Sequence, residues 1–242
     1  AQTGWYFQNP EAEGNVLRST SFADINKGLA VGEKGTILKT TDGGTSWVKM
    51  ASPTTKDLYG VSFSDAGHAV AVGKNGSLLQ STDGGNSWVV KSVNVYPDLY
   101  QVKFLNASFG IITGDVGKIL RTTDGGLTWT PQASGSFSRL NAVEIIDENT
   151  ATAVGNNGTI LRSTDGGQTW NPQTSPVNQQ LLSVAFSDPN TGVITGFNGT
   201  VLYTSNGGNT WDVSPQQTTG EINSVKFFTP ARCVAVCSGY EI

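Results

Sequence analysis

Short apolar runs recur along the whole chain and alternate with glycine-rich polar turns. One type of run resembles L-x-x-V-x-F and begins at Leu17, Leu58, Leu99, Leu140, Leu181 and Ile222. Runs of the types Ala-Val-Ala-Val-Gly and Thr-Ile-Leu follow it, and a short segment after a tryptophan completes each unit. Short runs rich in β-branched residues and bounded by turn residues predict β-strands joined by hairpins. The pattern therefore predicts an all-β protein.

A 41-residue repeat orders these strands. The turns TTDGGTSW, STDGGNSW, TTDGGLTW, STDGGQTW and TSNGGNTW share one register, with their key residues at Asp42, Asp83, Asp124, Asp165 and Asn206. The tryptophans follow the same register at Trp47, Trp88, Trp129, Trp170 and Trp211. Four antiparallel strands in about 40 residues are typical of one β-propeller blade. We call the four strands A to D, with D beginning at the tryptophan.

The repeat number predicts a single propeller domain over residues 1–242, with six blades. Five repeats are complete, and residues 222–242 supply only strands A and B and the start of strand C of a sixth. Trp5 lies 42 residues before Trp47, so residues 1–9 are expected to supply the missing strand D and close the ring. Such closure would hide the edges of the last sheet. A longer natural protein with further blades is the alternative.

The recurring Asp-Gly-Gly motif has the chemistry of a turn. An aspartate or asparagine side chain bonds readily to backbone N–H groups just ahead of it, and glycine tolerates the positive φ angles of tight turns. Asn206 occupies the aspartate position in one copy, and asparagine caps turns well but is a poor general acid. Propeller geometry also places the five copies on separate blades. We therefore interpret the motif as structural and expect no catalytic residue in it.

The motif S/T-x-D-x-G-x-T-W resembles the Asp-box, or BNR repeat, of sialidases and related propellers. Together with the preceding V-G-x-x-G-T-I-L segment, seen at residues 31–38 and 154–161, it is most similar to the photosystem II assembly and stability factor family and its secreted bacterial relatives. This resemblance implies a non-enzymatic factor that binds protein. Photosynthetic members dock through an arginine-rich surface, whereas this chain has scattered arginines and an acidic balance.

Composition narrows the possible partners. The net charge of −4 with only 15 basic residues argues against nucleic acid and anionic membranes as partners. No apolar run is long enough to span a bilayer, which predicts no membrane insertion. With one histidine and two cysteines, no metal site or cofactor is expected. Cys233 falls where other repeats have glycine or alanine, so a small buried residue is expected there.

The sequence gives little support for an enzyme. The arginine cluster and Tyr–Glu pair of a sialidase are not recognisable, and no nucleophile elbow is visible. A glycosidase requires two carboxylates in one cleft. Glu33 and Asp115 occupy equivalent turns two blades apart and are the best candidates for such a pair. Solvated turn residues are the simpler interpretation, and a glycoside hydrolase is the least favoured function.

The repeats differ most at the B–C turns and D–A connections, which share one face of a propeller, opposite the Asp-boxes. We expect a protein partner to bind there, with lectin-like carbohydrate binding as the alternative. Candidate residues are Glu33, Lys74, Tyr96, Asp115, Phe137, Asn156, Phe197 and Tyr240. The start at Ala1-Gln2 resembles the product of signal-peptide cleavage and predicts a secreted or periplasmic protein, although an arbitrary boundary would leave the same residues.

Overall fold

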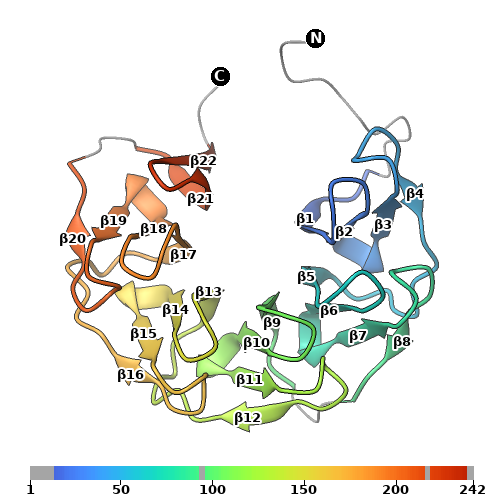
Figure 1. The fold of residues 1–242 in the computed structure, drawn as a ribbon, viewed down its shortest axis with the longest axis horizontal. Helices are drawn as coiled ribbons and strands as arrows, with labels where there is room; N and C mark the ends of the chain where they lie inside the picture. The colour runs from blue at the N-terminus through green and yellow to red at the C-terminus, as the bar shows by residue number, and fades with distance from the viewer. Residues whose placement is uncertain (1–13, 93–95, 216–218, 239–242) are drawn as a thin grey trace.

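The computed structural model describes residues 14–92, 96–215 and 219–238. In these ranges the chain forms five four-stranded antiparallel sheets and one two-stranded sheet, and no α-helix. The sheets follow one another around an arc, each with its first strand towards the centre and its last at the periphery (Figure 1). The predicted all-β propeller of four-stranded antiparallel blades is therefore confirmed.

Each blade takes its strands in chain order, and the bounds follow the 41-residue repeat. Blade 1 contains β1 (Leu17–Phe22), β2 (Gly28–Gly32), β3 (Ile37–Thr40) and β4 (Val48–Lys49). Blade 2 contains β5 (Leu58–Phe63), β6 (Ala69–Gly73), β7 (Leu78–Ser81) and β8 (Val89–Val90). Blade 3 contains β9 (Leu99–Phe104), β10 (Gly110–Gly114), β11 (Ile119–Thr122) and β12 (Thr130–Gln132).

The last two complete blades have the same plan. Blade 4 contains β13 (Leu140–Ile145), β14 (Ala151–Gly155), β15 (Ile160–Ser163) and β16 (Asn171–Pro172). Blade 5 contains β17 (Leu181–Phe186), β18 (Gly192–Gly196), β19 (Val201–Thr204) and β20 (Asp212–Val213). The terminal hairpin is β21 (Glu221–Thr229) with β22 (Arg232–Ser238). A three-residue 3₁₀ turn joins strands B and C of each complete blade: Glu33–Gly35, Lys74–Gly76, Asp115–Gly117, Asn156–Gly158 and Phe197–Gly199.

The hydrophobic core lies between neighbouring blades. Leu29 and Val31 of blade 1 pack with Leu58 and Val61 of blade 2, while Val70 on the other face of blade 2 packs against blade 3. Strands β2, β6, β10 and β14 are buried along their whole length. Both faces of a middle strand are thus covered, which explains why the strand B runs are apolar without a polar face.

Side chains also tie the inner strands together around the centre. The backbone N–H of Val61 donates to Ser19 Oγ of the preceding blade, and that of Phe104 donates to Ser62 Oγ. The Val225 N–H donates to Ser183 Oγ, so the terminal hairpin is joined to blade 5 in the same way. The innermost strands of neighbouring blades are not paired by backbone ladders, and these side chains satisfy their inward N–H groups.

Two glycines in each B–C segment explain the Val-Gly-x-x-Gly motif. A Cβ on Gly73 would overlap the carbonyl oxygen of Asp57, because strand B passes close to the start of strand A there. The residue before the second glycine adopts positive φ in every complete blade: Lys34, Asn75, Val116, Asn157 and Asn198. Asparagine suits that conformation, whereas a β-branched residue such as Val116 (φ 48°) is strained in it.

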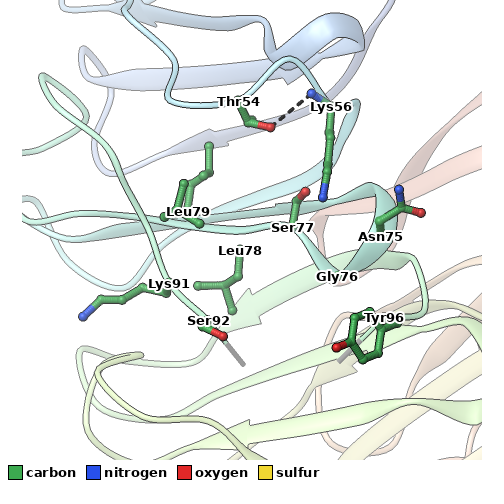
Figure 2. Close-up of a pocket in the computed structure, with 11 residues that line it drawn as sticks. Thr54, Lys56, Asn75, Gly76, Ser77, Leu78, Leu79, Lys91, Ser92 and Tyr96 are labelled. Atoms are coloured by element: carbon green, nitrogen blue, oxygen red, sulfur yellow. Dashed lines mark hydrogen bonds between the residues drawn. The ribbon is translucent and has the colours of Figure 1, made fainter. Parts of the chain in front are cut away.

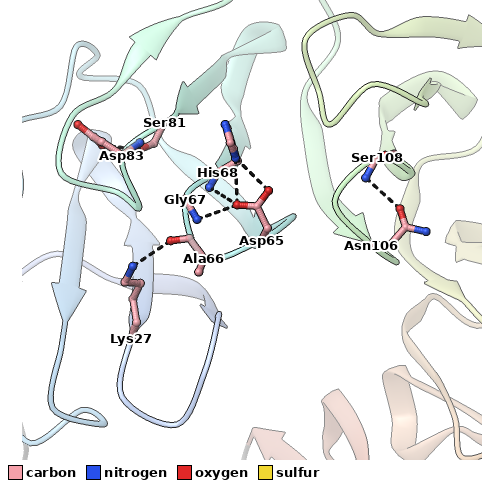
Figure 3. Close-up of polar contacts among 9 residues, drawn as sticks. All are labelled: Lys27, Asp65, Ala66, Gly67, His68, Ser81, Asp83, Asn106 and Ser108. Carbon is pink, nitrogen blue, oxygen red and sulfur yellow. Dashed lines mark hydrogen bonds and ion pairs between the residues drawn. The ribbon is translucent and has the colours of Figure 1, made fainter.

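A second recurring turn, which the sequence reasoning missed, joins strands A and B. Asp65 Oδ1 accepts hydrogen bonds from the N–H groups of Gly67 (2.7 Å) and His68 (2.9 Å), and Asn106 Oδ1 does the same for the equivalent residues of blade 3 (Figure 3). The equivalent residues of the other complete blades are Asp24, Asp147 and Asp188. The signal was an Asp or Asn at 41-residue spacing.

The terminal hairpin departs from the expected sixth repeat. Ser238 occupies the repeat position at which the B–C turn begins in the complete blades, but it lies in β22, opposite Glu221. Cys237 replaces the close-contact glycine, so strand B continues where the other blades turn. Cys233, predicted to be buried, is exposed and has a free thiol, because no described sheet covers that side of β22. In the described residues the arc is open between β22 and β1 (Figure 1); the closing segment, residues 1–9, lies outside them.

Candidate binding face

The Asp-boxes are closed hydrogen-bonded turns. Asp42 Oδ1 accepts from the N–H of Ser46 (2.9 Å) and the hydroxyl of Thr40 (2.8 Å), and Asp42 Oδ2 accepts from the Ser46 hydroxyl (2.6 Å). The Ser46 hydroxyl and N–H lower the pKa of Asp42 to about 2. Asp83, Asp124 and Asp165 accept the same bonds. Each carboxylate is therefore committed to its own turn.

Asn206 keeps this geometry without a charge. Its Oδ1 accepts from the N–H of Thr210 (3.1 Å) and the hydroxyl of Thr204 (2.9 Å), while its Nδ2 donates to Thr210 Oγ1 (2.8 Å). The tryptophans that follow in blades 2 to 5 pack between blades: Trp88, Trp170 and Trp211 are buried, and Trp129 is half-buried. Trp47 of blade 1 is also half-buried and packs edge-on against Phe22 of its own blade. The amide shows that these turn bonds do not require a negative charge.

Hydrogen bonds assign the turns to two opposite faces. The Gly43 N–H of an Asp-box donates to the Asn26 carbonyl of an A–B turn (2.9 Å). The Gly117 N–H of a B–C turn donates to the Ser138 carbonyl of a D–A connection (2.8 Å). On the Asp-box face, Lys27 Nζ also reaches across to the Ala66 carbonyl of the next blade (Figure 3). The B–C turns and D–A connections share the other face, where the candidate residues were predicted.

Three of those candidates make polar contacts within their own part of the face. Glu33 accepts from Arg18 NH2 at 2.8 Å, and Asp115 Oδ1 accepts from Arg139 Nε at 3.2 Å. Asn156 Oδ1 accepts from the side-chain amides of Asn141 and Gln180. Glu33 and Asp115 are thus each held by an arginine and are not brought together as a carboxylate pair.

The other candidates differ in exposure. The side chains of Tyr96 and Phe137 are 87% and 92% exposed, and Lys74 is also exposed. Phe197 is half-buried, and Tyr240 lies outside the described residues. Tyr96 and Phe137 occupy the same repeat position in successive D–A connections, so neighbouring blades present the two rings.

Four residues that the sequence reasoning did not select form the most specific cluster on this face. Tyr59 and Tyr100 stack at 5.3 Å between ring centroids, with an angle of 15° between the rings. Arg18 lies over Tyr59 (5.8 Å to the centroid), and Arg139 lies over Tyr100 (4.4 Å). We call these four residues the Arg–Tyr ladder. Burial raises the pKa of Tyr100, so its hydroxyl is neutral and donates to Asp115.

Three residues of the ladder, Arg18, Tyr59 and Tyr100, line a polar central cavity. Strands β1, β5, β9, β13, β17 and β21 line this cavity, which has a volume of about 510 Å³. Inside it, Lys103 Nζ of blade 3 pairs with Glu144 Oε2 of blade 4 at 2.7 Å. Among the described residues, no cluster of three histidine, cysteine or acidic side chains could hold a metal ion. Nor does this part of the chain contain a helix long and apolar enough to cross a membrane.

Comparisons with known proteins agree with this architecture. The family model of the photosynthesis system II assembly factor YCF48 matches residues 45–175. The structure of YCF48 bound to D1 peptide is similar at 20% identity and a TM-score of 0.63, over 96% of this chain and 92% of that one. YCF48 from Cyanidioschyzon merolae is similar at 20% identity and a TM-score of 0.60, over 94% of each chain.

More distant propellers share the fold alone. The GH74 enzyme of Niastella koreensis has 17% identity and a TM-score of 0.73, over 91% of this chain but only 44% of the enzyme.

A search of curated proteins finds no match. The family model covers more than half of the chain. The chain therefore belongs to the family of the photosynthesis system II assembly factor YCF48.

Proposed function

We propose that this protein is a non-enzymatic binding propeller that holds an extended segment of a protein partner on its B–C/D–A face. The Arg–Tyr ladder is the observation that carries the proposal. Tyrosine and arginine, with tryptophan, are the residue types most enriched among the energetically dominant residues of protein interfaces. Here two tyrosines and two arginines form one cluster beside the central cavity, and Arg18 and Arg139 remain 43% and 39% exposed.

The ladder is rigid yet keeps unused donors. Glu33 and Asp115 each bind one nitrogen of an arginine, and each guanidinium lies over a tyrosine ring. Arg139 NH1 and NH2 make no hydrogen bond within the described chain. A pre-organised guanidinium loses little entropy when it binds a partner's carbonyl or carboxylate oxygens. A related propeller was solved with D1 peptide bound, which supports a peptide-sized partner.

The test is selection of random displayed peptides on the wild-type protein, followed by fluorescence anisotropy on the selected peptides. We expect Tyr100→Ala and Arg139→Gln to weaken binding by about tenfold or more, the effect of losing a central interface residue. Gln180→Ala, on the amide-lined side of the same face, is the matched control and should leave affinity unchanged. Failure to enrich any peptide, or equal binding by Tyr100→Ala, would overturn the proposal.

The absence of catalysis is part of the same proposal. Glu33 and Asp115 are each bound to an arginine, and the Asp-box carboxylates are bound within their own turns. Neither set offers the acid and base that glycoside hydrolysis requires. Aryl-glycoside substrates should give no turnover above blank. Turnover that Glu33→Ala or Asp115→Ala abolishes would contradict this.

A further inference from the structure

The outer flank of blade 2 contains a hollow that the ladder does not use. It has a volume of about 630 Å³ and lies between the blade 1–blade 2 connection, the B–C turn of blade 2 and strands β7 and β8 (Figure 2). That volume is in the range of small-molecule sites. The ladder belongs to the inner strands, so the two features are separate.

The side chains around the hollow are arranged for a polar ligand with one flat apolar face. Lys56 extends across the hollow towards Ser77 and Asn75, whereas Tyr96 stands on the other side, beyond Gly76 (Figure 2). The Lys56 ammonium and the Asn75 amide make no hydrogen bond or ion pair within the described chain, and the Tyr96 ring is 87% exposed. Lys91 also lines the hollow, but its ammonium points away from it (Figure 2).

The equivalent hollows of blades 1 and 4 lack this combination. The hollow of blade 4, about 350 Å³, has Asn178 at the Tyr96 position and no aromatic or charged lining residue. The hollow of blade 1, about 590 Å³, has Thr55 there and likewise no aromatic residue. The repeat therefore forms a similar hollow in several blades. In blade 2 this hollow is lined by an aromatic ring, an amide and an unpaired ammonium together.

We propose that the blade 2 hollow binds a sugar residue bearing a carboxylate, as in a uronic-acid polysaccharide. The apolar C–H face of a pyranose packs on an exposed aromatic ring such as Tyr96. The Asn75 amide can donate to and accept from the sugar hydroxyls. The Ser77 hydroxyl, which donates its proton to the Lys74 carbonyl, offers its oxygen as an acceptor. Lys56 supplies the positive charge for the carboxylate, which distinguishes a uronate from a neutral hexose. The site is independent of the peptide-binding function proposed for the ladder.

The experiment is ligand-observed NMR and calorimetry on the full chain with trigalacturonate, with maltotriose as the neutral probe. We expect the wild type to bind trigalacturonate in preference to maltotriose. Tyr96→Ala should weaken the binding of both sugars by about tenfold, and Lys56→Gln should weaken only that of trigalacturonate, by a similar factor. Raising the salt concentration should reproduce the selective loss.

Three variants serve as controls. Phe137→Ala removes the exposed ring at the same position one blade later, Lys91→Gln removes the lysine that points away, and Tyr100→Ala disrupts the ladder. All three should bind trigalacturonate as the wild type does. The proposal is overturned if the wild type does not bind at millimolar sugar, or if Tyr96→Ala leaves the affinity unchanged. Loss in Lys56→Gln alone would show a plain anion site and overturn the sugar assignment.

Discussion

The B–C/D–A face has two halves built on one backbone. Over blades 1–3 the inner rim carries Arg18, Tyr59 and Tyr100, whereas the same repeat positions in blades 4 and 5 are Asn141 and Leu182. The B–C turns change from Glu33, Lys74 and Asp115 to Asn156 and Phe197. In blade 4 the amides satisfy one another, since Asn156 accepts from both Asn141 and Gln180. In blades 1–3 exposed rings and unused cationic donors remain.

The comparison of the two halves shows which residues the fold requires and which are available to bind a partner. Glycines and asparagines recur in both halves where the backbone requires them. Aromatic and charged residues occur mainly in one half, at positions where Asn141 and Asn156 of blade 4 show that an amide is compatible with the fold. We infer that blades 1–3 select the partner and that blades 4 and 5 mainly support the ring. Four experiments test this comparison.

The largest expected effect tests whether the two halves share one backbone. Gly73→Ala and Gly155→Ala would place a Cβ against the carbonyl oxygens of Asp57 and Arg139, respectively. We expect each to lower the free energy of unfolding by about 3 kcal/mol, the cost of severe overpacking, as measured by urea denaturation. Gly135→Ala gives a control where a Cβ meets no neighbour, although its positive φ carries a smaller cost. If Gly73→Ala left the free energy of unfolding unchanged while Gly155→Ala lowered it, the two halves would differ in backbone at this position.

A reciprocal exchange between the halves should have a moderate effect. Val116→Asn should stabilise the protein by about 1 kcal/mol, because asparagine tolerates the left-handed backbone that strains valine. Asn157→Val, the same position in blade 4, should destabilise it by a similar amount. Thermal denaturation measures both. If both changes destabilise, the side chain of Val116 contributes packing that outweighs its strain.

A smaller effect tests whether blade 4 stabilises the fold without contributing to peptide binding. Asn156→Ala leaves the amides of Asn141 and Gln180 without their shared acceptor. Because these groups are only partly buried, we expect a loss of about 1 kcal/mol in unfolding free energy. Peptide affinity should not change, and Lys74→Ala serves as the exposed control for stability. A large loss of peptide affinity in Asn156→Ala would extend the binding site into blade 4.

The smallest effect concerns pH. Hydrogen bonds from Ser46, Ser87 and Thr169 lower the pKa values of Asp42, Asp83 and Asp165 from 3.8 to about 2. A carboxylate with a lowered folded-state pKa contributes stability above its unfolded pKa, and this is lost as the pH falls towards the folded value. Melting temperature should therefore decline modestly between pH 4 and pH 2 through these exposed groups, and Asp165→Asn should reduce the slope. An unchanged slope would show that this turn bond adds no stability.

The repeat predicted the blades well because one hydrophobic period and one turn motif are local in sequence. Strand A was correctly placed at Leu17, Leu58, Leu99, Leu140 and Leu181. The ladder was missed because Tyr59 and Tyr100 meet only after two blades stack, although Arg, Tyr and Tyr at 41-residue spacing were visible. The exposure of Cys233 was missed because burial of strand B depends on a neighbouring sheet, which the strand's own sequence does not supply.

The ties around the central cavity have a direction. Ser19 and Ser183 accept the N–H of the following blade. Ser224 occupies the same repeat position in the terminal hairpin, and its hydroxyl binds no N–H within the described chain. Ser62 of blade 2 and Gln101 of blade 3 likewise accept an N–H of the blade that follows, so all of these hydrogen bonds run in the same direction around the ring. A tandem duplication of a 41-residue unit that carries such an acceptor would preserve its hydrogen bond to the following blade, which gives a physical route by which propellers of this kind gain blades.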